Sequence, residues 1–206
     1  MEWKMVGRVK GGKSWHERHS REHGVKMAKQ QNYRNRAAIK LLEIDAKFNL
    51  LKPKSTVIEL GAAPGGWSQV IAPKVKALVA CDLLDMKPVD NTCFIQGDFT
   101  DETVQAQMLD ALADPITLIC SDMAPNMTGI KIADQENMRL LLESVIAFSD
   151  RHLSQGGSLL FKCFESPDIQ KAIKSMSPKF FKIHRYKPPT SRQESTEFYL
   201  VALKKK

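Results

Sequence analysis

The segment TVIELGAAPGGW, residues 56–67, joins a short apolar run to a glycine-rich turn and then to a helical pattern. Thr56–Leu60 has the β-branched and aliphatic composition of a buried strand, and Gly61, Gly65 and Gly66 come directly after it. A strand that ends in such a turn and opens a helix is typical of an open α/β sheet, which binds nucleotide-like ligands at this place. The glycines allow close approach of a ligand to the backbone, and the helix N-terminus offers free N–H groups.

The rest of the chain alternates short β-type runs with helical stretches. We predict strands at Thr56–Leu60, Ala77–Cys81, Cys93–Gln96, Ile116–Ser121, Ser158–Cys163, Phe180–His184 and Phe198–Leu203. Helices are predicted over residues 66–73, 101–112, 134–153 and 167–176, after an amphipathic helix that starts near Arg36 and closes at the Lys-Pro pair 52–53. This alternation predicts a Rossmann-like α/β fold, with a seven-stranded, mostly parallel sheet and helices on both faces. The last two strands should form an antiparallel C-terminal hairpin, because no helical pattern separates them.

The positive charge of the chain, +8 in total, is concentrated near its N-terminus. Residues 1–40 hold eleven Lys and Arg against three Asp and Glu, whereas residues 41–206 hold twenty of each. A basic arm beside a neutral body is typical of proteins that meet polyanions, although a solubilising tail has the same composition. We therefore divide the chain into a basic N-terminal arm, residues 1–32, much of it irregular when free, and a single domain, residues 33–206.

Several other classes of protein are disfavoured. No apolar run approaches the ~18 residues of a membrane-spanning helix, and the basic N-terminus lacks the apolar segment of a secretory signal, so we expect a cytoplasmic location. The four cysteines form no C-x-x-C pair, which disfavours a zinc site or a disulfide framework. His16, His19 and His23 have helical spacing but lack Cys or carboxylate partners, so no metal site is expected. No long apolar stripe indicates a dimer, and we expect a monomer.

Carboxylates stand at the carboxyl ends of the first four predicted strands, namely Glu59, Asp82, Asp98 and Asp122. They would repel a pyrophosphate and attract a sulfonium with an α-amino group, and the turn lacks the G-x-G-x-x-G pattern of dinucleotide sites. Asp82 is placed to accept both hydroxyls of a ribose, and Asp98 to accept from an adenine amino group. The predicted cofactor is therefore S-adenosylmethionine, bound by Glu59, Gly61, Gly65, Gly66, Trp67, Asp82, Asp98 and Asp122.

The fourth predicted strand ends in the segment Ser121–Asn126, with the sequence SDMAPN. It lacks the Pro-Pro-aromatic pattern of enzymes that methylate exocyclic base amines, and the Pro-Cys pair of enzymes that methylate carbon 5 of cytosine. Lys162 lies inside an otherwise apolar strand, where a lysine is costly unless it is paired or used. A snorkelling lysine or a structural ion pair is the ordinary alternative.

Six well-spaced segments carry a resemblance to a known family. They are Tyr33–Leu41, Glu59–Gln69, Ala80–Leu84, Gln96–Phe99, Ser121–Asn126 and Gly156–Lys162. In order and spacing they resemble the RrmJ/FtsJ family of methyltransferases, and the likeness runs from about Tyr33 to the C-terminus. The resemblance implies a catalytic tetrad of Lys40, Asp122, Lys162 and Glu197. It also implies 2′-O-methylation of a uridine in the A-loop of 23S rRNA, within the large ribosomal subunit.

The sequence leaves three questions open. Lys162 acts either as a neutral general base or as a charged group that orients the ribose oxygen and stabilises developing alkoxide. The substrate is either 23S rRNA or, since the tetrad is shared, a tRNA or an mRNA cap. A non-catalytic RNA-binding assembly factor is the alternative from another class, which four intact tetrad residues disfavour. In each case the basic arm, with Arg34, Arg36 and the interleaved Trp3, Trp15 and Tyr33, is expected to bind RNA.

Overall fold

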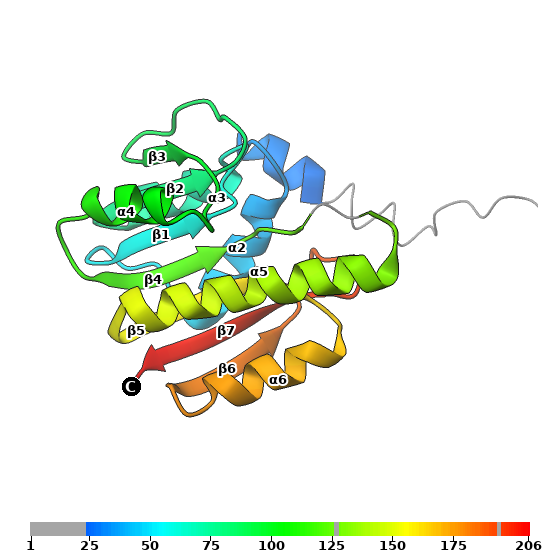
Figure 1. The fold of residues 1–206 in the computed structure, drawn as a ribbon. Coiled ribbons are helices and arrows are strands. Elements are labelled where there is room, and N and C mark those ends of the chain that lie inside the picture. The colour runs from blue at the N-terminus through cyan, green and yellow to red at the C-terminus, as the bar shows by residue number, and fades with distance from the viewer. Residues whose placement is uncertain (1–23, 126–127, 193–194) are drawn as a thin grey trace, which may run out of the picture.

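The computed structural model describes residues 24–125, 128–192 and 195–206 as one α/β sandwich (Figure 1). The strands are β1 (Thr56–Leu60), β2 (Ala77–Asp82), β3 (Cys93–Gln96), β4 (Ile116–Ser121), β5 (Leu153–Phe164), β6 (Phe180–Tyr186) and β7 (Glu197–Lys205). The helices are α2 (Ala37–Phe48), α3 (Gly66–Ile71), α4 (Glu102–Asp110), α5 (Lys131–His152) and α6 (Pro167–Met176), with a 3₁₀ turn η1 (Ala72–Lys74).

All seven strands form one sheet in the order β3-β2-β1-β4-β5-β7-β6. Strands β1 to β5 pair in parallel, whereas β7 is antiparallel to both of its neighbours, β5 and β6. The predicted fold, with its antiparallel C-terminal hairpin, is confirmed. Strand order reverses between β1 and β4, so the crevice for a ligand lies at the carboxyl ends of these two strands.

Helices cover both faces of the sheet, as Figure 1 shows. Ile58 and Leu60 of β1 belong to the core beneath α4, α5 and α6, whereas Val57 packs with α2 and α3 on the other face. Every residue of β1 is buried, as expected for a central parallel strand. This arrangement sandwiches the strand that leads into the glycine-rich turn, and so holds the turn in place.

Most predicted boundaries differ from the structure by three residues or fewer, and the two described next differ for a clear physical reason. Helix α2 ends at Phe48 and not at the Lys-Pro pair, because Asn49 adopts a left-handed conformation (φ 51°, ψ 55°) and its N–H donates to Asp45 O. Strand β5 begins at Leu153, five residues earlier than predicted, directly after α5. A left-handed Gly156 (φ 75°) interrupts its apolar pattern, which hid this part of the strand in the sequence.

The end of the N-terminal arm differs from the expectation of irregular chain. Residues 24–30 are helical, and Ala28 is buried. Trp3, Trp15 and the three histidines at 16, 19 and 23 lie outside the described residues. Among the described helices, none is long and apolar enough to cross a membrane. The four cysteines are free, and all but Cys93 are buried.

Candidate active site

A cavity of about 460 Å³ opens at the carboxyl ends of the central strands. Its size lies within the ~300–1,000 Å³ of small-molecule sites. Four of the eight residues predicted to bind the cofactor line it: Gly61, Asp82, Asp98 and Asp122. Residues of α5, among them Leu140 and Ser144, close its other side.

Gly61 follows β1 directly and lines this cavity. Its φ of 77° is left-handed, and a Cβ there would lie 2.6 Å from Met123 Cγ and 2.9 Å from Met123 N. Both Gly61 and Met123 line the cavity. Only glycine satisfies the backbone conformation and the close approach of the segment after β4 at the same time.

Backbone and side-chain hydrogen bonds position Asp82 and Asp98 at the cavity wall. Asp82 Oδ2 accepts a hydrogen bond from Ala63 N at 2.8 Å, and its Oδ1 accepts one from Leu84 N at 2.9 Å. Asp98 Oδ1 accepts from Thr100 N at 2.8 Å and from Thr100 Oγ1 at 2.7 Å. A carboxylate has about four lone-pair positions, so each keeps acceptor capacity for hydroxyl or amino groups of a ligand.

The other three glycine-turn residues of the prediction lie outside the cavity lining. A Cβ on Gly65 would lie 2.6 Å from Arg34 Nη1, and one on Gly66 would lie 2.0 Å from Asn35 Oδ1. Trp67 is buried, and its Nε1 donates to Ala37 O at 2.9 Å. These three residues therefore pack α3 against the segment that leads into α2, and any part they have in cofactor binding stays a prediction.

Arg34, expected among the RNA-binding cations, has its guanidinium engaged within the protein. Its Nη1 donates to Pro64 O at 3.0 Å, and its Nη2 donates to Pro88 O at 2.6 Å. Its backbone N–H donates to Gln69 Oε1 at 2.8 Å. Arg34 thus ties the glycine-rich turn to the loop after β2.

Glu59 lies fully buried behind the cavity. Ser68 Oγ donates to its Oε2 at 2.6 Å, whereas its Oε1 has no hydrogen-bond partner among the described residues. Burial raises the pKa of Glu59 to about 8; the Ser68 hydrogen bond opposes this rise, and the Asp122 carboxylate adds to it. A positive charge in the neighbouring cavity would stabilise the ionised form of this group. The carboxylate-rich wall and the unsatisfied Glu59 therefore fit a cationic ligand such as a sulfonium with an ammonium group.

We expect the thermal stability of the ligand-free protein to fall as the pH rises through the neutral range. Because the pKa of Glu59 is about 8 in the folded state and near 4.5 when unfolded, the folded state binds more protons between these values. The free energy of unfolding then falls by at most ~1.4 kcal/mol per pH unit. Thermal melts at several pH values should show this slope in the wild type and a flatter one in Glu59→Gln. Parallel slopes in the two proteins would contradict the assignment.

The four residues of the implied tetrad come together beside the cavity, from α2, the end of β4, β5 and the start of β7. They form two ion pairs: Lys40 Nζ with Glu197 Oε1, and Lys162 Nζ with Asp122 Oδ1 at 3.2 Å. Lys162 Nζ also donates to the backbone oxygen of Asp122. The four side chains are between 10% and 19% exposed, so water screens their charges weakly.

Tyr199, which sequence reasoning missed, lies between the two ion pairs. Its hydroxyl donates to Asp122 Oδ1 at 2.9 Å, and Lys40 Nζ lies 5.9 Å from the centroid of its ring. Burial, with the Asp122 charge, raises the pKa of Tyr199 well above its usual value, so the hydroxyl stays a donor. Strand periodicity would have indicated it, because residues 197 and 199 share one face of β7. The pairing of Lys162 with Tyr199 needed the tertiary structure.

Comparisons with known proteins show what the chain is similar to. Residues 33–205 match the FtsJ-like methyltransferase family. The chain is 41% identical to "Ribosomal RNA large subunit methyltransferase E" of Nitrosospira multiformis, over 97% of this chain and 98% of that one. It is 42% identical to the protein of the same name from Pseudomonas aeruginosa, over 96% and 97%. A solved structure from Plasmodium falciparum, described as that of a ribosomal RNA methyltransferase, superposes with a TM-score of 0.75 at 30% identity, over 84% and 98%.

Proposed function

The chain belongs to the FtsJ-like methyltransferase family, and we propose that it methylates the 2′-hydroxyl of a uridine ribose in 23S rRNA of the large ribosomal subunit. The methyl donor of the family is S-adenosylmethionine. The observation that carries the proposal is the convergence of Lys40, Asp122, Lys162 and Glu197 next to a carboxylate-lined cavity. All four residues come from one chain, which supports a monomer as the active unit.

The cavity lining supports a specific placement of the cofactor. We assign Asp82 to the two ribose hydroxyls and Asp98 to the adenine amino group, because both carboxylates line the cavity and keep unused lone pairs. Asp122 lines the cavity and also belongs to the tetrad, so it lies between cofactor and substrate. Glu59 lies behind the wall, where a bound cationic donor would stabilise its ionised form.

The tetrad supplies positioning and charge for the methyl transfer. When bound, S-adenosylmethionine provides an activated methyl group, and an in-line displacement then depends mainly on how the acceptor oxygen is held. Lys162 donates to the Asp122 carbonyl oxygen and forms an ion pair with the Asp122 carboxylate. These contacts support the charged role for Lys162, in which it orients the 2′-oxygen and stabilises developing alkoxide. The hydroxyl proton then leaves to the Asp122 carboxylate or to water as the oxygen attacks.

The N-terminal arm is assigned to RNA binding. Residues 1–23 hold six Lys and Arg against three Asp and Glu. Lys29 and Arg36, which follow them in the chain, line a hollow of about 320 Å³ together with Arg192. We expect removal of residues 1–23, which leaves the helical residues 24–30 in place, to raise the KM for RNA ~10-fold or more at ~0.1 M salt and to weaken its salt dependence. The KM for S-adenosylmethionine, measured in the same assay, should stay constant, and an unchanged KM for RNA would refute this role of the arm.

The proposed function is tested by acceptor choice and by the site of methylation. Transfer of tritiated methyl groups should be measured on intact large subunits, free 23S rRNA, tRNA and capped mRNA. Ribose methylation of rRNA should then be mapped by mass spectrometry in cells with and without the gene. We expect rRNA to be the acceptor and one uridine to lose its 2′-O-methyl group. Preferred transfer to tRNA or caps would support the alternative substrates, and no transfer to any RNA would indicate a non-catalytic assembly factor.

A further inference from the structure

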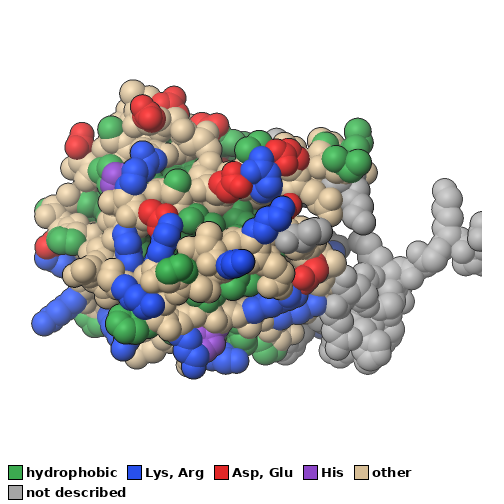
Figure 2. Space-filling view, turned by 60° about the horizontal axis from the view of Figure 1, so that its bottom comes forward, with side chains coloured by type: hydrophobic (Ala, Val, Ile, Leu, Met, Phe, Trp, Pro, Cys, Tyr) green, Lys and Arg blue, Asp and Glu red, His purple; other side chains and the backbone are tan. Residues whose placement is uncertain are grey.

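The C-terminal end of the domain carries as much excess positive charge as residues 1–40. Residues 169–206 hold ten Lys and Arg against two Asp and Glu. Residues 41–168 hold ten against eighteen, which is why residues 41–206 as a whole have no net charge. The body is therefore divided into an acidic part with the cofactor cavity and a basic part made of α6, β6 and β7. Figure 2 shows many Lys and Arg side chains on the face that comes forward from the bottom of Figure 1.

Lys182 of this basic part and Lys47 of α2 belong to a compact group between α2 and the outer strand β6, which we call the edge cluster: Lys47, Phe48, Lys182, His184 and Tyr186. Lys47 Nζ lies 4.3 Å from the centroid of the Tyr186 ring. The Phe48 ring lies 5.1 Å from that of His184 and 5.4 Å from that of Tyr186. Lys182 and His184 lie two residues apart on one face of β6. Burial lowers the pKa of His184, and the charges of Lys182 and Lys47 lower it further. The edge cluster thus interleaves aromatic rings with cations.

The cations of the edge cluster are not neutralised within the part of the chain that the structure describes. Neither Lys47 nor Lys182 forms an ion pair there, and both are exposed. Glu43, an acid on the same helix as Lys47, accepts hydrogen bonds from Thr190 N at 3.2 Å and Thr190 Oγ1 at 2.8 Å. Strand β6 is also the last strand of the sheet, so backbone N–H groups on its outer side have no strand partner. Unpaired cations, exposed N–H groups and aromatic rings together suit a nucleic-acid backbone.

The edge cluster begins next to the tetrad and leads away from it. Tyr186 pairs in register with Tyr199, and residues 184 and 182 follow along β6. From Tyr186 to Lys182 the strand covers ~13 Å, at ~3.3 Å per residue. On α2, Lys47 follows Lys40 by about two helical turns, or ~10 Å. At the ~3.4 Å rise per nucleotide of a stacked nucleic-acid strand, these distances correspond to about three to four nucleotides.

We propose that the edge cluster binds the ribose-phosphate backbone of the RNA that flanks the methylated nucleotide, with Lys47 and Lys182 on phosphates and the exposed edges of the aromatic rings against a base. This inference rests on the proposed function, and it adds a second RNA contact on the side of the active site opposite the cofactor cavity. A protein of the large subunit, which would recognise the same exposed charge by acidic side chains, is the competing partner.

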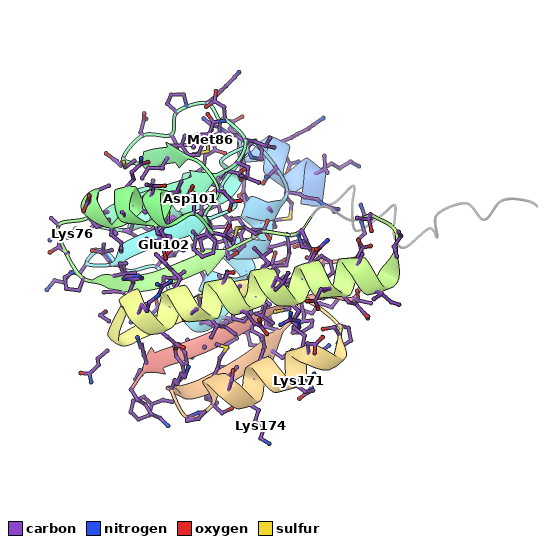
Figure 3. The ribbon with its side chains drawn as sticks, in the orientation of Figure 1. Lys76, Met86, Asp101, Glu102, Lys171 and Lys174 are labelled. Atoms are coloured by element: carbon purple, nitrogen blue, oxygen red, sulfur yellow. The ribbon has the colours of Figure 1, made fainter. Side chains whose placement is uncertain are left out.

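The test compares two double variants that each remove two positive charges. Lys47→Gln/Lys182→Gln alters the edge cluster, whereas Lys171→Gln/Lys174→Gln alters α6, which packs on the other face of the sheet (Figure 3). We expect the first variant to weaken binding of protein-free 23S rRNA ~10-fold at ~0.1 M salt and to reduce the slope of log Kd against log salt by about 1.5, since each phosphate contact contributes ~0.7–0.9. The second variant should change both quantities less than twofold. Affinity for S-adenosylmethionine and the kcat at saturating RNA should stay unchanged in both.

Equal Kd values and salt slopes in the two double variants would overturn the inference, because the edge lysines would then only protect β6 from pairing with other strands. A defect of Lys47→Gln/Lys182→Gln that appears on intact subunits but not on protein-free rRNA would also overturn it, in favour of a protein partner. The binding comparison does not require turnover. If the wild type bound rRNA but transferred no methyl group, the proposed function would fail, and the Kd values of the two double variants would still show whether the edge cluster binds RNA.

Discussion

Replacing Lys162 by alanine should lower kcat by about 10³-fold or more and leave the Kd of S-adenosylmethionine within about twofold. Lys162 Nζ contacts Asp122 O and Asp122 Oδ1. In the proposed mechanism this is where the acceptor oxygen meets the methyl group. Lys162 is absent from the lining of the cofactor cavity, so its loss removes a group that acts on the acceptor and not on the donor. Single-turnover methyl transfer and cofactor titration of the same preparations measure the two quantities separately.

Two further variants make this test specific. Lys179→Ala removes a lysine that pairs with Asp150, outside the cavity lining, and should leave kcat unchanged. Lys162→Arg keeps the positive charge but cannot serve as a neutral base, so we expect it to retain measurable activity if Lys162 works as a charged group. Activity as low as that of Lys162→Ala would instead support the neutral general base. Near-normal transfer by Lys162→Ala, in protein whose circular dichroism and melting show a native fold, would remove Lys162 from the mechanism.

Gly61→Ala should lower the free energy of unfolding by about 2–4 kcal/mol and kcat/KM for the cofactor by about 10²-fold. The added methyl group would lie 2.6 Å from Met123 Cγ and 2.9 Å from Met123 N, and backbone at that distance has to shift. Met123 follows Asp122 and lines the cavity with it. The displacement therefore reaches the cofactor cavity and the Lys162–Asp122 pair together.

Gly156→Ala is the matched control for this prediction. Its φ of 75° is nearly that of Gly61, 77°, but a Cβ at Gly156 meets nothing within 4 Å. It should show only the left-handed strain of about 1–2 kcal/mol and no change in cofactor affinity. Equal effects of the two substitutions on the free energy of unfolding and on cofactor affinity would mean that the close approach of Met123 to Gly61 is not important for stability or binding.

How much of the fold could be predicted varied along the chain. Strands β1 and β4 have the predicted bounds, because each is a continuous apolar run between turn residues. The end of α2 was mispredicted because a left-handed Asn49 stops the helix where the helical pattern of the sequence continues. The start of β5 was mispredicted because a left-handed Gly156 interrupts the apolar pattern of the strand. Such left-handed conformations depend on the surrounding structure, and the periodicity of the sequence does not predict them.

The same distinction separates the parts of the candidate site. The order of strands and helices, and with it the positions of Asp82, Asp98 and Asp122 at strand ends, could be read from the chain because these follow from the pattern of adjacent residues. The folded structure was needed to show that Tyr199 joins the two ion pairs, that Arg34 faces protein carbonyls and that Lys47 lies beside β6, the strand of Lys182. Lys40 and Glu197 are 157 positions apart, and their contact depends on the packing of α2 against β7. Contacts of this kind arise from how apolar faces are buried against one another, which a one-dimensional pattern does not encode.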